Sequence, residues 1–204
     1  MNTESKKRRV AFQGERGAFS EEAALKLLGE DIELVPRRTF ADLFDSLDSG
    51  AADSLLAPVE NTIVGIVQPS VDLMNSKSLN ILDEVRIKIE QHLIGCPNST
   101  FDQIETVQSH PTALAQCNRF FATHPQLKPI IADDTAGSVA EVIRRGDPTR
   151  AAIAGQHAAE HYGATILRKS IQDHSENYTR FVLLSAPTEQ ISIEPTLLVK
   201  EYAS

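Results

Sequence analysis

The stretch "ILDEVRIKIEQHLI", Ile81 to Ile94, decides the fold. Within it, Val85, Ile87 and Ile89 alternate with charged residues. A period of two is typical of a β-strand with one buried face and one face in water. The stretch is also long enough to leave one lobe of a molecule and enter another. We therefore expect a two-lobed fold in which the chain crosses here.

On both sides of this crossing, short apolar strands alternate with helices. We expect strands at residues 9–13, 33–37, 54–57, 106–108, 129–132, 151–154, 165–167 and 179–185. We expect helices at residues 21–28, 40–49, 68–75, 111–122, 135–145 and 156–162. Ser20 and Thr39 are the expected caps of the first two helices, and Pro58 is expected to stop the third strand. Such alternation predicts an α/β fold with largely parallel sheets covered by helices.

A second crossing is expected near residues 168–177, so the chain would return to the lobe in which it began. The first lobe would combine residues 9–84 with 177–186, and the second would span residues 85–170. Ligands of such folds bind beyond the carboxyl ends of the strands, between the lobes. The sequence therefore predicts an active site in the inter-lobe cleft.

The composition excludes several classes of protein. Of the 204 residues, 41% are hydrophobic and 24% charged, as in a soluble globular protein. The net charge of −8 argues against nucleic acid or an anionic membrane as partner, although residues 6–9 form a short basic run. No apolar stretch reaches the roughly 20 residues of a membrane span. Cys96 and Cys117 are too few for a disulfide framework, which favours reduced thiols and a cytoplasmic protein.

Two short motifs are weak signals of a ligand. The run from His157 to His161 fits H-x-x-E-H, and its histidines would share one helix face as a zinc site requires. No third ligand is apparent after it, so we favour a solvated helix face and expect no metal. Gly14 to Gly17 could present N–H groups to an anion, but the segment lacks the dinucleotide and Walker patterns.

Small polar residues follow several of the expected strands. They are Asn61 and Thr62, Ser109 and His110, Asp134 and Thr135, and the run from Asn177 to Arg180. Taken singly, each is typical of a turn or a helix cap. Taken together, they could converge on one cleft, where helix dipoles and Arg180 would favour an anionic ligand.

Four ordered segments resemble motifs of the prephenate dehydratase family. They are "FQGERGAFSEEAA" (12–24), "PVENTIVGIVQPSVDLM" (58–74), "VQSHPTALAQC" (107–117) and "NYTRF" (177–181). The resemblance runs from about Val10 to Ser185. An ordered set of this kind is far more specific than any one of its members, so we expect a carbon–oxygen lyase.

The resemblance implies two α/β lobes similar to the type II periplasmic binding fold, with the active site between them. It implies the conversion of prephenate into phenylpyruvate, CO2 and water, without a cofactor. By the same resemblance, Thr179 donates a proton to the departing hydroxyl, Arg180 holds a substrate carboxylate and Phe181 packs beneath. The other residues that would line the substrate site are Asn61, Thr62, Ser109, His110, Thr135 and Asn177.

The chain departs from the family pattern at three places. Thr62 and Asp134 both stand where the family usually has Ser, and the added carboxylate puts nearby anion contacts in doubt. The tail at 187–204 resembles only the first strand of a regulatory ACT domain, so we expect no inhibition by phenylalanine. An exposed tail strand could pair with a second copy, which makes a homodimer plausible.

Two other functions stay open at this point. Arogenate dehydratase performs the same reaction on the aminated substrate, and the residue types do not separate the two. A non-catalytic two-lobed module could also bind a small acid, because fold does not fix function. The Thr179–Arg180 pair favours the enzyme.

Overall fold

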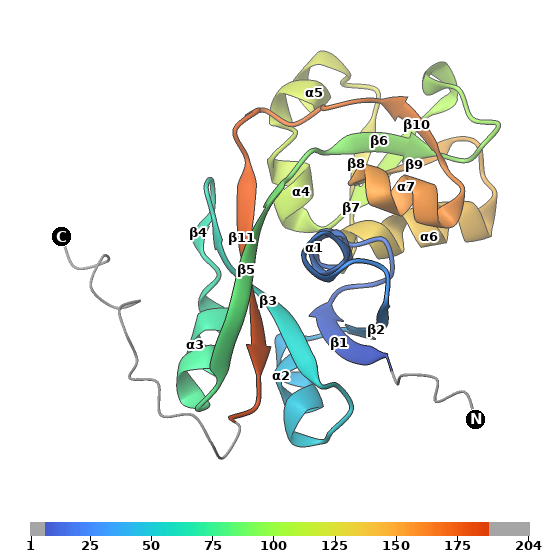
Figure 1. Ribbon diagram of the computed structural model, residues 1–204. Helices are drawn as coiled ribbons and strands as arrows, with labels where there is room; N and C mark the ends of the chain where they lie inside the picture. The colour runs from blue at the N-terminus through green and yellow to red at the C-terminus, as the bar shows by residue number, and fades with distance from the viewer. Residues whose placement is uncertain (1–6, 188–204) are drawn as a thin grey trace, which may run out of the picture.

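Two mixed β-sheets carry the fold, as Figure 1 shows for residues 7–187, the part of the chain that the computed structural model describes. The first sheet has the order β2-β1-β3-β11-β5, with β4 paired to β3. Its strands are β1 (Arg8–Gln13), β2 (Ile32–Arg37), β3 (Ser54–Asn61), β4 (Gly65–Ile66), β5 (Asn80–Lys88) and β11 (Tyr178–Ser185). The second sheet has the order β10-β6-β9-β7-β8. Its strands are β6 (His92–Gly95), β7 (Thr106–Ser109), β8 (Lys128–Ile131), β9 (Arg150–Ala154) and β10 (Thr165–Arg168).

The two sheets are built on one plan, which confirms the two-lobed α/β fold, but the expectation of largely parallel sheets was wrong because β4, β5, β6, β10 and β11 all pair antiparallel. In each sheet three parallel strands meet a strand that runs antiparallel to them: β11 beside β3, and β6 beside β9. Each of these antiparallel strands enters its sheet from the other one, at the two crossings. The boundary expected between residues 84 and 85 falls inside β5, which pairs with β11 as far as Lys88. The first crossing therefore begins later than the sequence indicated.

Helices cover both faces of the first sheet and flank the second. They are α1 (Phe19–Leu28), α2 (Phe40–Asp48), α3 (Gln68–Ser76), α4 (Pro111–Ala115), α5 (Asn118–Thr123), α6 (Thr135–Arg145) and α7 (Gln156–Tyr162). On one face of the first sheet, Leu55 and Val182 pack with residues of α2. On the other, Leu56 and Phe181 pack with Ala23 and Ala24 of α1. Alternate residues of β3 and β11 thus belong to different cores.

Two expected helices differ in the structure. The first begins at Phe19 after Ala18, and Ser20 is buried inside it rather than capping it. The helix expected at 111–122 is broken into α4 and α5, because Gln116 closes the first and Cys117 precedes the second. The N–H of Asn118 and the N–H of Arg119 both donate to the carboxylate of Asp173, which caps α5. That long-range cap was not visible in the local sequence.

Pro58 does not stop the third strand, contrary to the prediction. β1 pairs with β3 only from Ser54 to Leu56, so no strand on that side requires an N–H from Pro58. On the other side, Phe181 pairs with Pro58 and Arg180 pairs with Glu60. Val59 is therefore the extra residue of a β-bulge, a feature that tolerates proline and bends the strand. Beyond the bulge, Asn61 lies opposite Thr179.

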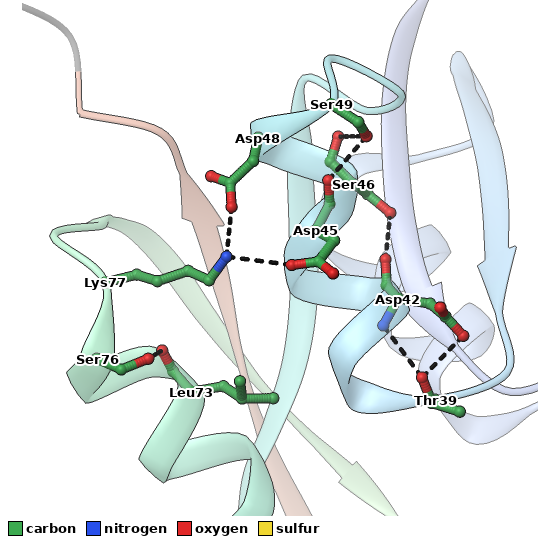
Figure 2. A network of polar contacts seen from close by, with 9 residues as sticks. All are labelled: Thr39, Asp42, Asp45, Ser46, Asp48, Ser49, Leu73, Ser76 and Lys77. Carbon is green, nitrogen blue, oxygen red and sulfur yellow. Dashed lines mark hydrogen bonds and ion pairs between the residues drawn. The ribbon is translucent and has the colours of Figure 1, made fainter.

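The cap predicted for the second helix is confirmed. The hydroxyl of Thr39 accepts a hydrogen bond from the N–H of Asp42, as Figure 2 shows. Farther along α2, Asp45 and Asp48 both contact the ammonium group of Lys77, which follows α3 (Figure 2). These contacts join the two helices on one face of the first sheet.

The two lobes pack closely on the side of α1 and α7. Phe12 and Ala18 of the first lobe share a core with Ala158 and Ala159 of the second. A Cβ on Gly17 would lie 2.8 Å from the Cα of Ala158, and a Cβ on Gly155 would lie 2.7 Å from the ring of Phe19. Glycine at both positions permits this approach of the backbones.

A buried ion pair joins the same two helices. The carboxylate of Glu21 is 1% exposed, and it accepts hydrogen bonds from Arg16 Nε and the Gly17 N–H, each at 2.9 Å. Its other oxygen lies 3.5 Å from Nε2 of His157 on α7. Burial alone would raise the pKa of Glu21, but contacts with His157, Arg16 and the Gly17 N–H outweigh it and lower that pKa to about 2. His157 thus serves a lobe contact, and across residues 7–187 no cluster of three potential metal ligands occurs.

We predict that His157→Gln weakens the fold in a pH-dependent way. Contact with Glu21 raises the pKa of His157, so its stabilisation is complete below about pH 6.5 and is lost as the pH rises through the raised value. Glu21 stays ionised throughout this range. Urea unfolding should show a loss on the order of 1 kcal/mol at pH 6 and a smaller loss at pH 9. His161→Gln, on the exposed side of α7, is the control, and equal losses at both pH values would contradict the ion pair.

Candidate active site

Asn61 and Thr179 form the centre of the site, where β3 and β11 meet the second crossing. Both side chains are buried, Asn61 being 7% and Thr179 9% exposed. Nδ2 of Asn61 lies 3.0 Å from Oγ1 of Thr179 and 3.1 Å from the carbonyl of Tyr178, so one of its hydrogens is shared between these two acceptors. Oδ1 of Asn61 accepts from the N–H groups of Ile63 and Val64 at 2.9 and 3.0 Å, which fixes the orientation of the amide. The Thr179 oxygen is therefore an acceptor toward Asn61, and its own proton is available elsewhere.

A series of hydrogen-bonded side-chain amides leads from Asn61 toward the second lobe. Nδ2 of Asn61 donates to Oδ1 of Asn177 at 2.7 Å, and Asn177 is fully buried. Nδ2 of Asn177 donates in turn to Oε1 of Gln116 at 3.2 Å. Sequence reasoning did not select Gln116, although it belongs to the segment "VQSHPTALAQC". No local signal in the sequence marks Gln116, because the break between α4 and α5 at which it lies depends on the distant Asp173.

The hydroxyl of Thr62 is engaged by the backbone of the second crossing. It donates to the carbonyl of Glu176 at 3.0 Å and accepts from the N–H of Tyr178 at 2.9 Å. The N–H of Thr62 also donates to the carbonyl of Tyr178 at 2.9 Å. Thr62 therefore holds the segment before Thr179 against the end of β3, and its only proton is already used.

Ser109, His110 and Thr135 form a second group, in the second lobe. Ser109 is buried and donates to the carbonyl of Ile153 at 2.6 Å. Nδ1 of His110 accepts from the N–H of Thr112 at the start of α4, and Thr135 opens α6. Among residues 7–187, no direct hydrogen bond joins these three side chains to Asn61 or Thr179. Their predicted contacts with substrate stay predictions.

Arg180 lies on the opposite face of β11 from Thr179, since successive residues of a strand alternate. Its Nε is 3.4 Å from Glu60 and its NH1 group 3.2 Å from Glu84, and its side chain is 14% exposed. A substrate carboxylate at Arg180 would have to displace two glutamates. Phe181 returns to the face of Thr179 and is buried against α1, the packing expected of it.

A cavity lies apart from Thr179, at the ends of β1, β2 and β8. It measures about 630 Å³, and its lining includes Glu15, Arg38, Asp42, Asp133, Asp134 and Glu141. Five carboxyl groups against one guanidinium do not suit a dianionic substrate. Asp134 itself caps α6 by accepting from the N–H of Gly137 at 2.5 Å, and burial raises the pKa of its carboxyl. The hydrogen-bonded centre, rather than this acidic cavity, is therefore our candidate site.

Comparison with known proteins identifies the family of this chain. Residues 10–189 match the family model described as prephenate dehydratase. The chain belongs to the prephenate dehydratase family. It is 34% identical over 177 residues to an arogenate dehydratase/prephenate dehydratase of Arabidopsis thaliana, covering 87% of this chain and 46% of that protein. The chain thus spans about half the length of the curated relatives it matches.

Two solved structures share the fold of this prephenate dehydratase family member. A prephenate dehydratase from Arthrobacter aurescens, in complex with L-Phe, has a TM-score of 0.81 at 26% identity, over 91% of this chain and 63% of that one. A protein described as a novel type of quorum quenching acylase has a TM-score of 0.80 at 31% identity, over 91% of this chain and 67% of that one. The same fold thus occurs under two different described activities.

For the prephenate dehydratase assay, we predict that Thr62→Val lowers kcat about tenfold and leaves KM within threefold. The change removes both hydrogen bonds to the segment before Thr179, each worth about 1 kcal/mol. Steady-state kinetics measure both constants. Thr62→Ser restores the hydroxyl and should recover most of the rate. A rise in KM with kcat unchanged would instead place Thr62 in contact with the substrate.

We predict that Arg180→Lys leaves KM within twofold. Lysine keeps the charge but loses the fork that reaches Glu60 and Glu84, so the free energy of unfolding should fall by about 1 kcal/mol. Urea unfolding and substrate titration of the same preparation give both quantities. A tenfold rise in KM would contradict this prediction and would indicate that Arg180 binds a substrate carboxylate, as the sequence suggested.

Proposed function

We propose that this chain catalyses the decarboxylating dehydration of prephenate to phenylpyruvate. One observation carries the proposal: the buried hydroxyl of Thr179 accepts from the fixed amide of Asn61 and so keeps its proton for another acceptor. A neutral donor held in this way suits a leaving oxygen. Membership of the family supports the same reaction.

The reaction needs orientation and one proton. The ring carboxylate leaves as CO2, and the electrons of the broken C–C bond form a new double bond in the ring. The C–O bond to the ring hydroxyl breaks at the same time, and the departing oxygen takes a proton and leaves as water. The ring becomes aromatic, so no electron-accepting cofactor is required.

Thr179 would supply or share that proton as the C–O bond lengthens. A threonine hydroxyl is a weak acid, so complete transfer before cleavage would be too slow. Donation must keep pace with departure, when the oxygen has become strongly basic. Asn61 assists because its N–H stabilises the negative charge that develops on Thr179 Oγ1.

Arogenate is the second candidate substrate, because the Arabidopsis relative is named for both activities. Arogenate carries an amino group where prephenate has a ketone, away from the oxygen that leaves. The contacts on Thr179 therefore fit either substrate. The ratio of kcat/KM for the two, measured side by side, decides between them.

An acylase activity is less compatible with the contacts of Thr179. An acylase that attacked through this hydroxyl would need a neighbouring base to take its proton. Asn61 instead presents an N–H to Thr179, and an amide N–H cannot accept a proton. Hydrolysis of an N-acyl amide by the wild type, abolished in Thr179→Val, would favour the acylase.

Our proposal places the enzyme in the cytoplasm as a homodimer. The two cysteines are free and buried, which is consistent with a reducing compartment. Ile81 and Leu82 are exposed on β5, an edge strand that could pair with another copy. Light scattering on the purified chain gives the oligomeric state. Across residues 7–187, no helix is long and apolar enough to span a membrane.

We predict that Thr179→Val lowers kcat at least about 100-fold, since valine keeps the shape and removes the donor. Phenylpyruvate absorbance after addition of prephenate measures the rate. Thr123→Val, which removes an exposed hydroxyl on α5, is the control and should retain full activity. A rate within threefold of wild type would remove Thr179 from the mechanism. Binding of prephenate without turnover by the wild type would favour the non-catalytic module.

A further inference from the structure

The amides between the two lobes have one common orientation, set by the backbone. The N–H groups of Ile63 and Val64 can only donate, so Asn61 must present its oxygen to them and its NH2 group to Asn177. Asn177 must then present its own NH2 group to Gln116. The choice between oxygen and nitrogen is thus fixed at each amide in turn.

Gln91 is the last member of this series. Its Nε2 donates to Oε1 of Gln116 at 3.4 Å, the same oxygen that accepts from Asn177. Because Asn177 and Gln91 both donate to Oε1 of Gln116, the oxygen of that amide, and not its NH2 group, faces the two crossings. The hydrogen bonds thus run without a break from Gln91 through Gln116, Asn177 and Asn61 to Thr179.

The surroundings of Gln91 show that its backbone is held in place and its side chain is buried. It lies in the first crossing, between β5 and β6, and is 3% exposed. Its N–H donates to Oε1 of Gln172 at 3.0 Å, and its carbonyl accepts from the N–H of Ile171 at 2.8 Å. Its Oε1 is buried without a hydrogen-bond partner among residues 7–187. The hydrogen bond from its Nε2 to Gln116 is the side-chain contact that an apolar residue here would lack.

We propose that Gln91 is a positioning residue for Thr179: its side-chain N–H holds Gln116, and through Gln116 it holds Asn177 against Asn61, in the orientation that the N–H groups of Ile63 and Val64 set. This role of Gln91 rests on the proposed function, because the hydroxyl that it helps to position, that of Thr179, is the one that donates to the substrate. Gln91 also joins the two crossings, since Gln116 contacts Asn177 in the second.

Two variants test the donor end of Gln91. Gln91→Met removes the donor at similar length and leaves Asn177 to orient Gln116, so kcat should fall about threefold at every pH. Gln91→Glu places a carboxylate oxygen against Oε1 of Gln116 and should lower kcat about 30-fold at pH 8. Below the pKa of the new carboxyl it regains an O–H donor, so kcat at pH 5.5 should return to within fivefold of wild type. KM should stay within threefold in both variants.

Other groups that titrate nearby are common to both variants. Glu90 and His92 flank Gln91 in the chain. The backbone N–H of Asp173 donates to the backbone carbonyl of Gln116. The Gln91→Met profile therefore records their titration, and the difference between the variants belongs to the new carboxyl. Thermal unfolding confirms that each variant is folded. Equal kcat values for the two variants at both pH values would overturn the proposal.

A measurement without substrate separates this proposal from the proposed function. In ¹⁵N-labelled protein, Gln91→Glu at pH 8 should shift the side-chain NH2 signals of Gln116 and Asn177, and acidification to pH 5.5 should reverse the shifts. Gln68→Glu, at an exposed position on α3, is the matched control and should leave these signals unmoved. Unmoved NH2 signals in Gln91→Glu would overturn the positioning role. Absence of turnover in the wild type would instead overturn the proposed function.

Discussion

The orientation of one amide, that of Asn61, governs the rest of the site. Two backbone N–H groups hold its oxygen, so its nitrogen must face Thr179 and Asn177. An amide that could turn over would let the Thr179 hydroxyl donate to Asn61 instead of to a ligand. The fixed amide therefore leaves the Thr179 proton for another acceptor. It does so in a buried setting, where hydrogen bonds are strong and water does not compete.

Asn61 reaches Thr179 only because β3 contains one extra residue. Ala57 pairs with Val182 and Pro58 with Phe181, and an unbroken ladder would then place Asn61 opposite Tyr178. A slip of one residue also sends a side chain to the other face of the sheet. The bulge at Val59 absorbs the extra residue, so that Asn61 shares the face of Thr179. The same bulge leaves Glu60 beside Arg180, on the opposite face, where the guanidinium contacts two glutamates.

The sequence predicted what depends on local pattern and on the order of motifs. Alternation in Ile81–Ile94 indicated the crossing, and the four motifs indicated the family and its two lobes. Local pattern failed where partners are distant: Pro58 was read as a stop because the bulge depends on β11, and the break at Cys117 depends on Asp173. The structure brings Asn61, Thr62, Asn177 and Thr179 together, and the substrate contacts of the other predicted site residues stay predictions. Their roles were not readable from sequence, because a hydroxyl such as that of Thr62 or Ser109 does not reveal there that its proton is already used.

The most direct test of this account is a double-mutant cycle between Asn61→Ala and Thr179→Val, measured as kcat/KM for prephenate at one pH. If the amide acts by directing the Thr179 proton, its loss has little further effect once that proton is gone. The double variant should then be no more than about threefold slower than Thr179→Val alone. Losses that multiply across the two changes would show that Asn61 and Thr179 act independently, and would contradict the account.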